Sequence, residues 1–450
     1  MITQAQYFKD LTAKANAELA RGESLNLNYT AEVSQFIRLN GSDGAKIRQI
    51  GSVSNADLDV SLFWASDSSI RKTTATVSLT GLLYEDWDRL KTMLELLRKE
   101  VADLPADPYA QLPINHGSSE STQTGKLLDP ELAPEILVRP LEGLDISGIY
   151  AAGTSIRAMA NSAGQFHWFN TEHFSFDYSL FTPAQRAVKG IYAGQNWDDG
   201  QYQQKIQASL ALLANLEKPA RKIAPGKYRT YLAPGSVADL VGMFSWACLS
   251  EAAIRQATSP LGKVRSGEKR FSEKFQLIED FRGGECPRFN DEGELAPDML
   301  PLIAQGGLAQ TLVSSRSEKE YGVKSNGANA WETLRAPSLL PGSLEEDQIL
   351  RELGTGLYLS NLHYLNWSDQ IGGRVTGMTR YACFWVENGQ IVSPIENLRW
   401  DDSIFELFGE HLVALTKDRA YQPDVGSYEW RSVGGSWVPG ALLSEMSFTL

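Results

Sequence analysis

One unusually apolar segment near the middle of the chain constrains the fold more than any other feature of the sequence. Residues 235–263 read GSVADLVGMFSWACLSEAAIRQATSPLGK. From Val237 to Ile254 nearly every side chain is apolar or small, and the only charges are Asp239 and Glu251. A helix that is apolar on all sides belongs in the interior of a protein. We therefore predict one buried helix over this stretch, followed by a glycine turn.

The length and charge of the chain narrow its class. At 450 residues the chain exceeds one ordinary core, so two or three domains are expected. A hydrophobic content of 42% and a charged content of 22% are typical of a globular protein. The 42 basic and 55 acidic residues leave a net charge of −13, and no basic stripe suited to nucleic acid is present. We expect no nucleic-acid partner.

Cysteine usage and hydropathy indicate a reducing, aqueous compartment. Cys248, Cys286 and Cys383 are odd in number and widely spaced, which suits neither a disulfide framework nor a zinc site. The N-terminal segment has helical spacing of apolar residues but lacks the apolar core of a signal peptide. No run elsewhere reaches the roughly 18 uncharged apolar residues of a membrane span. The expected location is the cytoplasm, without a membrane partner.

Hydrophobic periodicity predicts an α+β protein. Alternation from residue 28 onward, with Asn-Gly and Asp-Gly pairs at 40–41 and 43–44, predicts antiparallel strands that the helix YEDWDRLKTMLELLRKEVADL covers. A Pro-, Ser- and Gly-rich loop over 103–145 leads to short strands and the helix DGQYQQKIQASLALLANLE. The remainder is predicted to be a mostly β C-terminal domain that contains the buried helix. The predicted units are 1–102 and 103–220, together one N-terminal domain, and 221–450.

The sequence lacks the common signatures of hydrolytic sites. There is no HExxH, no GxSxG and no GxxxxGK[ST]. His167 and His173 flank Glu172 and would form a metal-ligand set with it. We favour the interpretation that both histidines lie in a β-sheet beside an aromatic cluster and make hydrogen bonds there, because ligand pairs usually have a third partner.

Four further polar residues are candidates for a site, and for each a structural role is the favoured interpretation. Glu406, Glu410 and His411 lie in DSIFELFGEHLVALTKD, for which we predict a helix. Residues four apart share a helical face, which suits a metal site, although a solvated face is the favoured interpretation. His363 is flanked by aromatic residues, so we predict that it packs in a core or an interface.

A cysteine nucleophile needs a nearby base and an electropositive setting. The apolar neighbours of Cys248 predict an inert buried thiol, and Cys383 is expected on a strand that faces a core. Cys286, in RGGECPRF, has the most exposed context of the three, but no base is identifiable beside it.

Several segments of the second half match a known family in order and spacing. They are FNDEGELAPDMLPLIAQGGLAQTLVSSRSEKEYGVKSNGAN (289–329), GTGLYLSNL (354–362), GGRVTGMTRYACFWVENGQIVSPIENL (372–398) and the terminal SWVPGALLSEMSFTL, with weaker matches in LPADPYAQLP and MANSAGQFHW. With these segments the chain resembles the TldD/PmbA family of zinc metallopeptidases. The resemblance is most specific over residues 279–416.

The resemblance has a direct consequence for zinc. In the catalytic subunits of that family the helix equivalent to 237–254 carries HExxxH, and a cysteine near the C-terminus is a further ligand. The equivalent positions here are Gly242, Met243 and Ala247, and the tail from Tyr421 onward has no cysteine. Zinc requires thiolate, imidazole or carboxylate ligands, which these side chains do not offer. The chain therefore resembles the PmbA (TldE) branch, whose members lack the metal motif.

The resemblance implies a non-metal-binding subunit that assembles with a zinc-bearing TldD-type subunit and helps to bind extended peptides. Neither catalytic nor metal-binding residues are expected in this chain, and zinc is expected only in the partner. Two alternatives remain: a stand-alone peptidase with a replaced site at Cys286 or around His167 and His173, and a homodimeric peptide-binding module.

Substrate peptides are expected to lie as an added strand beside glycines, where another backbone can approach closely. The predicted substrate-binding residues are Gly354, Thr355, Gly356, Gly372, Gly373 and Gly377, although these glycines equally suit hairpin turns. An oligomer is also expected, because the apolar segment and the aromatic strands offer more apolar surface than a small domain hides. The tryptophans behind this expectation are Trp385, Trp400, Trp430 and Trp437.

Overall fold

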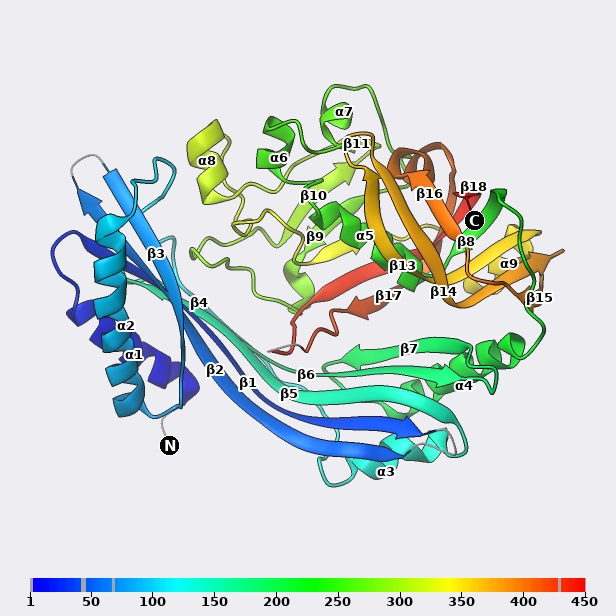
Figure 1. The fold of residues 1–450 in the computed structure, drawn as a ribbon, viewed down its shortest axis with the longest axis horizontal. Coiled ribbons are helices and arrows are strands. Elements are labelled where there is room, and N and C mark those ends of the chain that lie inside the picture. Colours follow the sequence, from blue (N-terminus) through cyan, green and yellow to red (C-terminus); the bar gives the residue numbers. More distant parts are fainter. Residues whose placement is uncertain (1–2, 42–45, 67–68, 428–429, 450) are drawn as a thin grey trace.

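The computed structural model describes residues 3–41, 46–66, 69–427 and 430–449, and within them two β-sheets form the frame of the molecule (Figure 1). Strands up to Gly194 belong to a seven-stranded sheet of the described chain, and strands from Gly226 onward belong to an eleven-stranded one. The predicted α+β class, with a largely antiparallel N-terminal sheet and a mostly β C-terminal part, is confirmed. The predicted boundaries at 102 and 220 stay predictions.

The first sheet is built from long, curved strands in the order β3-β2-β1-β5-β6-β4, and β7 pairs with β6. Its strands are β1 Glu23–Gly41, β2 Ile47–Ser66, β3 Ser69–Ser78, β4 Ser119–Gln123, β5 Asp145–Asn161, β6 Phe166–Phe181 and β7 Ala187–Gly194. β1 pairs antiparallel with both β2 and β5, so the predicted β1–β2 hairpin is confirmed. Its Asp-Gly pair at 43–44 lies outside the described residues.

Helices cover the two ends of this sheet, as Figure 1 shows. At one end lie α1 Gln4–Ala17 and α2 Leu83–Asp103, and at the other α3 Ala133–Val138, the 3-10 turn η1 Arg139–Leu141 and α4 Asp199–Leu216. Leu90, Leu94 and Leu97 form the buried face of α2 at helical spacing. The helices predicted here are confirmed, whereas the predicted loop over 103–145 also contains β4 and α3.

The second sheet closes partly on itself. The pairing order β18-β16-β14-β13-β8 returns to β18, because β8 pairs with both β13 and β18. Its strands are β8 Gly226–Leu232, β9 Leu277–Asp280, β10 Met299–Ala304, β11 Gly307–Leu308, β12 Pro337–Leu339, β13 Gly356–Asp369, β14 Arg374–Glu387, β15 Gln390–Pro394, β16 Arg399–Ser403, β17 Leu412–Pro423 and β18 Gly435–Phe448. Asn388 and Gly389 take the positive φ angles of a tight turn between β14 and β15.

The remaining elements of the second half are short. They are α5 Pro234–Gly242, η2 Met243–Ser245, α6 Glu251–Arg255, α7 Gly262–Arg265, η3 Phe281–Gly283, α8 Ser315–Tyr321, η4 Glu346–Gln348, α9 Ile349–Leu353 and the π-helical turn η5 Glu406–Glu410. Among them α5 lies deepest, and it contacts β8, β13, β17 and β18.

The prediction of one helix over 237–254 is wrong, although the burial of this segment is confirmed. The chain is helical in α5, tightens in η2 and turns at Ala247, whose φ of 62° is left-handed. Ser250 then begins α6 by accepting a hydrogen bond from the Ala253 N–H. Apolar side chains on both sides of the break are fully buried, because the break lets each short segment direct its own apolar residues into the core. These residues are Val237, Leu240, Val241, Phe244, Cys248 and Leu249.

The predicted helix over 402–418 is also wrong. Its centre forms the single turn η5, in which Gly409 has non-helical dihedral angles (φ −107°, ψ −111°). From Leu412 the chain becomes β17 and pairs with β18. Glycine offers little resistance to leaving the helix, and the ladder with β18 satisfies the backbone instead.

Two sequence expectations about apolar surface are affected by the fold. Apart from Trp246, which is 51% exposed, the large side chains of the apolar segment are buried within this chain, and Trp400 has no exposed surface. The predicted oligomer therefore stays a prediction without that support. In the described part of the chain, no helix is both long and apolar enough to span a membrane.

Candidate functional site

A cavity of about 830 Å³ lies where the two sheets face each other. The floor comes from β1, β5 and β7 of the first sheet, and one wall comes from α5 with the neighbouring part of β13. Residues 286–291 form another part of the wall, and the ends of β17 and β18 line the cavity beside α5. Its volume falls in the range of about 300–1,000 Å³ that is usual for ligand sites. We take this cavity as the candidate functional site.

Small residues of α5 form the wall that faces the cavity. Gly235, Ala238, Asp239, Gly242 and the following Ser245 recur at helical spacing and all line it. A Cβ added at Gly242 would meet no atom within 4 Å, so the cavity is open at this point. Asp239 is thus a single charged group on a wall of small side chains.

The positions that match the family's zinc motif do not fit a metal ion. Gly242 lines the cavity but has no side chain, Met243 is buried in the core, and Ala247 occupies the left-handed turn. Within the described ranges, no group of three or more His, Cys, Asp or Glu side chains is arranged to hold a metal. The residues present therefore do not fit zinc, and we derive no step that involves it.

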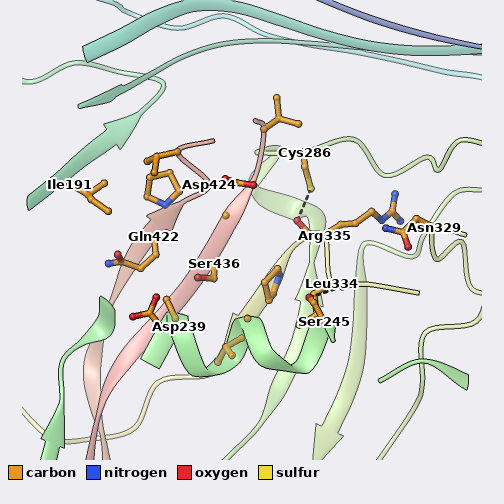
Figure 2. A pocket seen from close by; sticks show the side chains of 18 of the residues that line it. Ile191, Asp239, Ser245, Cys286, Asn329, Leu334, Arg335, Gln422, Asp424 and Ser436 are labelled. Atoms are coloured by element: carbon orange, nitrogen blue, oxygen red, sulfur yellow. Dashed lines mark hydrogen bonds between the residues drawn. The ribbon is translucent and has the colours of Figure 1, made fainter. Parts of the chain in front are cut away.

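Asp239 has an unusual environment for a carboxylate. Its Oδ2 accepts a hydrogen bond of 3.0 Å from the Leu362 N–H. Burial raises the pKa of Asp239 to about 6, although the Leu362 hydrogen bond and the charge of Lys189 oppose this shift. The Asp239 side chain faces the cavity, as Figure 2 shows.

Arg431 joins the β17–β18 loop to the first sheet. Its Nη2 donates to the carbonyl oxygens of His173 (3.0 Å) and Ala151 (3.3 Å), and its N–H donates to Glu32 Oε2 (2.7 Å). The side chain is only 6% exposed, and burial lowers its pKa to about 10. This anchor fixes the strand ends that carry Gln422 and Ser436 over the first sheet.

Arg335 fixes the segment that contains Cys286. Its guanidinium donates to the carbonyl oxygens of Gly327 (2.8 Å) and Phe289 (2.9 Å), and the Cys286 thiol contacts the Arg335 carbonyl. The expectation that Cys286 is exposed is wrong, because the residue is 7% exposed. Burial raises the pKa of its thiol to about 12, so the reactive thiolate is scarce at neutral pH.

The two histidines of β6 make hydrogen bonds within the sheet, as the favoured interpretation predicted. His167 Nδ1 contacts Ser119 Oγ at 2.7 Å and its Nε2 contacts the Gly293 carbonyl at 3.1 Å. His173 contacts Ser155 and Arg431, and burial lowers its pKa to about 3. Glu172 instead accepts the N–H of Gly125 at 2.9 Å. These three side chains do not meet at one site.

The remaining cysteine, histidine and glutamate residues considered as candidates do not form a common site. Cys248 and Cys383 are buried, as predicted, and burial raises the pKa of both thiols. His411 lies 3.7 Å from Glu410, but the helical face expected for this pair and Glu406 is absent because η5 ends at Glu410. His363 lines the cavity, and its ring contacts that of the exposed Tyr364 in a tilted arrangement, with 4.0 Å between the ring centroids.

The six residues predicted to bind substrate lie outside the lining of the cavity. A Cβ at Gly356 would lie 2.1 Å from the Arg229 carbonyl of β8, and one at Gly377 would lie 2.8 Å from Trp400. Gly372 and Gly373 form the turn between β13 and β14, and Gly354 ends α9 beside Thr355. The space beside Gly356 and Gly377, which the absence of a side chain leaves open, is filled by other residues of this chain. Their role in substrate binding stays a prediction.

Sequence reasoning missed the polar residues that share the cavity wall with Asp239. Asp239 itself was visible as one of two charges in the apolar segment. Gln422 and Ser436 carry no comparable signal, because their position depends on the register between β17 and β18.

The two sheets, the cavity between them and the buried α5 define the chain as an α+β protein. A sequence model described as the PmbA/TldA metallopeptidase C-terminal domain matches residues 225–450. The chain therefore belongs to the PmbA/TldD metallopeptidase family.

Individual relatives agree with this assignment. The protein named metalloprotease PmbA from Escherichia coli O157:H7 is 24% identical over 259 residues, which are 56% of this chain and 55% of that protein. A metalloprotease PmbA homolog from Haemophilus influenzae is 22% identical over 438 residues, covering 92% and 90% of the two chains.

Solved structures show the same fold. TldE from Thermococcus kodakarensis superposes with a TM-score of 0.75 at 14% identity, covering 99% of this chain and 100% of that one. A proposed modulator of DNA gyrase from Thermotoga maritima gives a TM-score of 0.74 at 13% identity, again over 99% and 100%. At these identities the likeness concerns the fold alone.

Proposed function

We propose that this chain is the non-metal-binding subunit of a TldD/PmbA-type metallopeptidase complex. In this proposal it assembles with a zinc-bearing subunit and holds extended peptide substrates in the cavity between its two sheets. The observation that carries the proposal is the wall formed by α5. The element equivalent to the family's zinc helix lines a cavity of about 830 Å³, yet it has Gly242, Met243 and Ala247 where metal ligands would stand.

The chemistry of the chain supports a binding role over independent catalysis. Cys286 is buried with a raised pKa, and His167 and His173 are engaged in hydrogen bonds of the sheet. The alternative of a stand-alone peptidase therefore has no support from the residues that were its candidate catalytic groups. A homodimeric peptide-binding module uses the same cavity and differs only in its partner. We place the complex in the cytoplasm, since the three cysteines are free and suit a reducing compartment.

The test is co-purification from the native host, followed by a peptide-cleavage assay of the purified complex. We expect a zinc-bearing family member to accompany this chain, and the pair to cleave unfolded peptides that neither subunit cleaves alone. Recovery of this chain only as a homodimer would favour the binding module. Cleavage by this chain alone would overturn the proposal.

A matched pair of variants tests the cavity. At Gly242 and at Gly262 an added Cβ meets no atom within 4 Å, but only Gly242 lines the cavity. Gly242→Trp should fill the cavity and lower peptide turnover by about tenfold or more while the complex persists, as displacing a ligand from its pocket does. Gly262→Trp should leave turnover unchanged. Equal turnover in both variants would exclude the cavity as the peptide site.

A further inference from the structure

Three polar side chains converge on one side of the cavity from three different elements. Asp239 comes from α5, Gln422 from β17 and Ser436 from β18. Gln422 and Ser436 are directly opposite each other in the β17–β18 ladder, so their side chains share one face. Figure 2 shows the Asp239 carboxylate pointing away from α5, toward these strands.

Most of the hydrogen-bonding capacity of this cluster is unused. The Leu362 N–H occupies Oδ2 of Asp239 and holds the carboxylate in place, while no donor within the described ranges reaches its Oδ1. In the same ranges, the side chains of Gln422 and Ser436 make no hydrogen bond. The free polar atoms of these three side chains are not sealed in the core, so water or a ligand in the cavity can reach them.

The charge of Asp239 is also uncompensated. Lys189, which weakly stabilises it from a distance, forms its ion pair with Asp177. Arg335 donates to main-chain carbonyls, and Arg157 does the same toward Ile156 (2.8 Å) and Arg431 (3.0 Å). In the described part of the chain Asp239 therefore has no ion pair, and a cationic ligand would stabilise this partly buried carboxylate.

The acceptor atoms of Asp239, Gln422 and Ser436 suit some cations better than others. A metal ion normally takes several carboxylate or carbonyl ligands, and within the described residues no group of three His, Cys, Asp or Glu side chains is placed to hold one. A guanidinium donates best to both oxygens of a carboxylate at once, and the Leu362 N–H competes with it for Oδ2. An ammonium has three donors in a compact head, which match Asp239 Oδ1, the Gln422 amide oxygen and Ser436 Oγ.

We propose that Asp239, Gln422 and Ser436 form a binding site for a primary ammonium group of a peptide held in the cavity. The inference rests on the proposed function, since it assumes that the cavity holds peptides. The shared chemistry covers both the N-terminal amine of a peptide and a lysine side chain. The site would thereby fix the position of a peptide relative to α5.

The experiment measures binding of a peptide set to the purified full chain by calorimetry. The set comprises a peptide with a free N-terminus and one lysine, its N-acetylated form, its acetyl-lysine form and the doubly acetylated form. We expect the doubly acetylated form to bind about tenfold or more weakly, as loss of a charge-assisted contact predicts. The singly acetylated forms identify which amine occupies the site.

Single-residue variants test whether this preference for charged peptides depends on the three proposed residues. Asp239→Asn keeps an acceptor for the Leu362 N–H and should remove the discrimination between charged and acetylated peptides, whereas Gln422→Ala and Ser436→Ala should each reduce it in part. Glu410→Gln removes the same charge on the surface, where its side chain is 74% exposed, and should leave the discrimination unchanged.

The outcomes separate the two proposals. Peptides that bind equally well with and without ammonium groups would overturn the ammonium site but leave the proposed function intact. If no peptide binds, 1-aminohexane and 1-hexanol are compared by ligand-observed NMR with wild type and Asp239→Asn. Amine-selective binding that Asp239→Asn abolishes would support the site and count against peptide binding, and its absence would overturn both.

Discussion

Replacing Glu251 with glutamine tests the electrostatics of the segment that follows α5. Glu251 is 1% exposed and lies in the first turn of α6. Its carboxylate accepts hydrogen bonds from Arg255 Nε (2.7 Å), Arg265 Nη1 (3.1 Å) and Thr311 Oγ1 (2.7 Å). Burial alone would raise the pKa of Glu251, but these donors outweigh burial and lower it from 4.5 to about 2.

The shift sets the magnitude of the expected effect. One pKa unit corresponds to about 1.36 kcal/mol, so the full shift equals about 3 kcal/mol of unfolding free energy at neutral pH. Water screens part of this, because the side chains of Arg255 and Arg265 are 47% and 37% exposed. We therefore expect Glu251→Gln to lower the free energy of unfolding by about 2 kcal/mol at pH 7.

The sign of the pH dependence follows from the direction of the shift. A folded-state pKa below the unfolded value contributes stability that is fully present above pH 4.5 and is lost as the pH falls toward about 2. The difference between wild type and Glu251→Gln should therefore be constant from neutral pH down to the ordinary pKa. Below it, the difference should shrink.

Urea unfolding followed by tryptophan fluorescence, at a series of pH values, measures this difference. Glu352→Gln is the control, because Glu352 forms an ion pair of 3.3 Å with Arg351 on the surface, where their side chains are 47% and 70% exposed. The control should be indistinguishable from wild type. Equal stability of Glu251→Gln and Glu352→Gln at pH 7, or a difference that persists unchanged in acid, would refute the reasoning.

Four further outcomes are expected. The buried thiols of Cys248, Cys286 and Cys383 should resist an aromatic disulfide reagent at pH 8 in the folded protein and react together after unfolding in urea, and rapid labelling of Cys286 alone would contradict its burial. Gly356→Ala places a Cβ 2.1 Å from the Arg229 carbonyl and should cost about 3 kcal/mol of unfolding free energy. Gly242→Ala should be neutral or stabilise by up to about 1 kcal/mol, as thermal unfolding will show. Elemental analysis of the isolated chain should find zinc well below one equivalent, and tight binding lost on replacing His167 and His173 would overturn that expectation.

The fold was predictable where the signal is local. Alternating side chains and an Asn-Gly pair specify the β14–β15 hairpin, and the spacing of Leu90, Leu94 and Leu97 specifies α2. The two wrong helices, over 237–254 and over 402–418, have a common cause. Apolar side chains have no preferred direction inside a core, so the sequence indicated burial but not whether one helix or several short turns achieve it.

The candidate site was less predictable because it is a property of tertiary structure. The cavity exists only where the two sheets face each other, and its walls come from residues as distant as Thr30 and Ser436. The cluster at Asp239 depends on which residue of β17 lies opposite Ser436, and a register shift of one residue would turn Gln422 to the other face. The Leu362 N–H that holds Asp239 comes from a strand 123 positions away.

The two charged residues of the apolar segment, Glu251 and Asp239, differ in their roles because they differ in their neighbours. Glu251 has Arg255 four residues later on the same helix, so its neutralisation is encoded beside it. Asp239 has Gly235, Ser236, Gly242 and Met243 at the equivalent spacings, and none of them carries a charge. A carboxylate in such a segment is stable only where a cavity gives it water or a ligand. The presence or absence of a basic residue at helical spacing thus distinguishes Glu251, which has a structural role, from Asp239, which is available to bind a ligand.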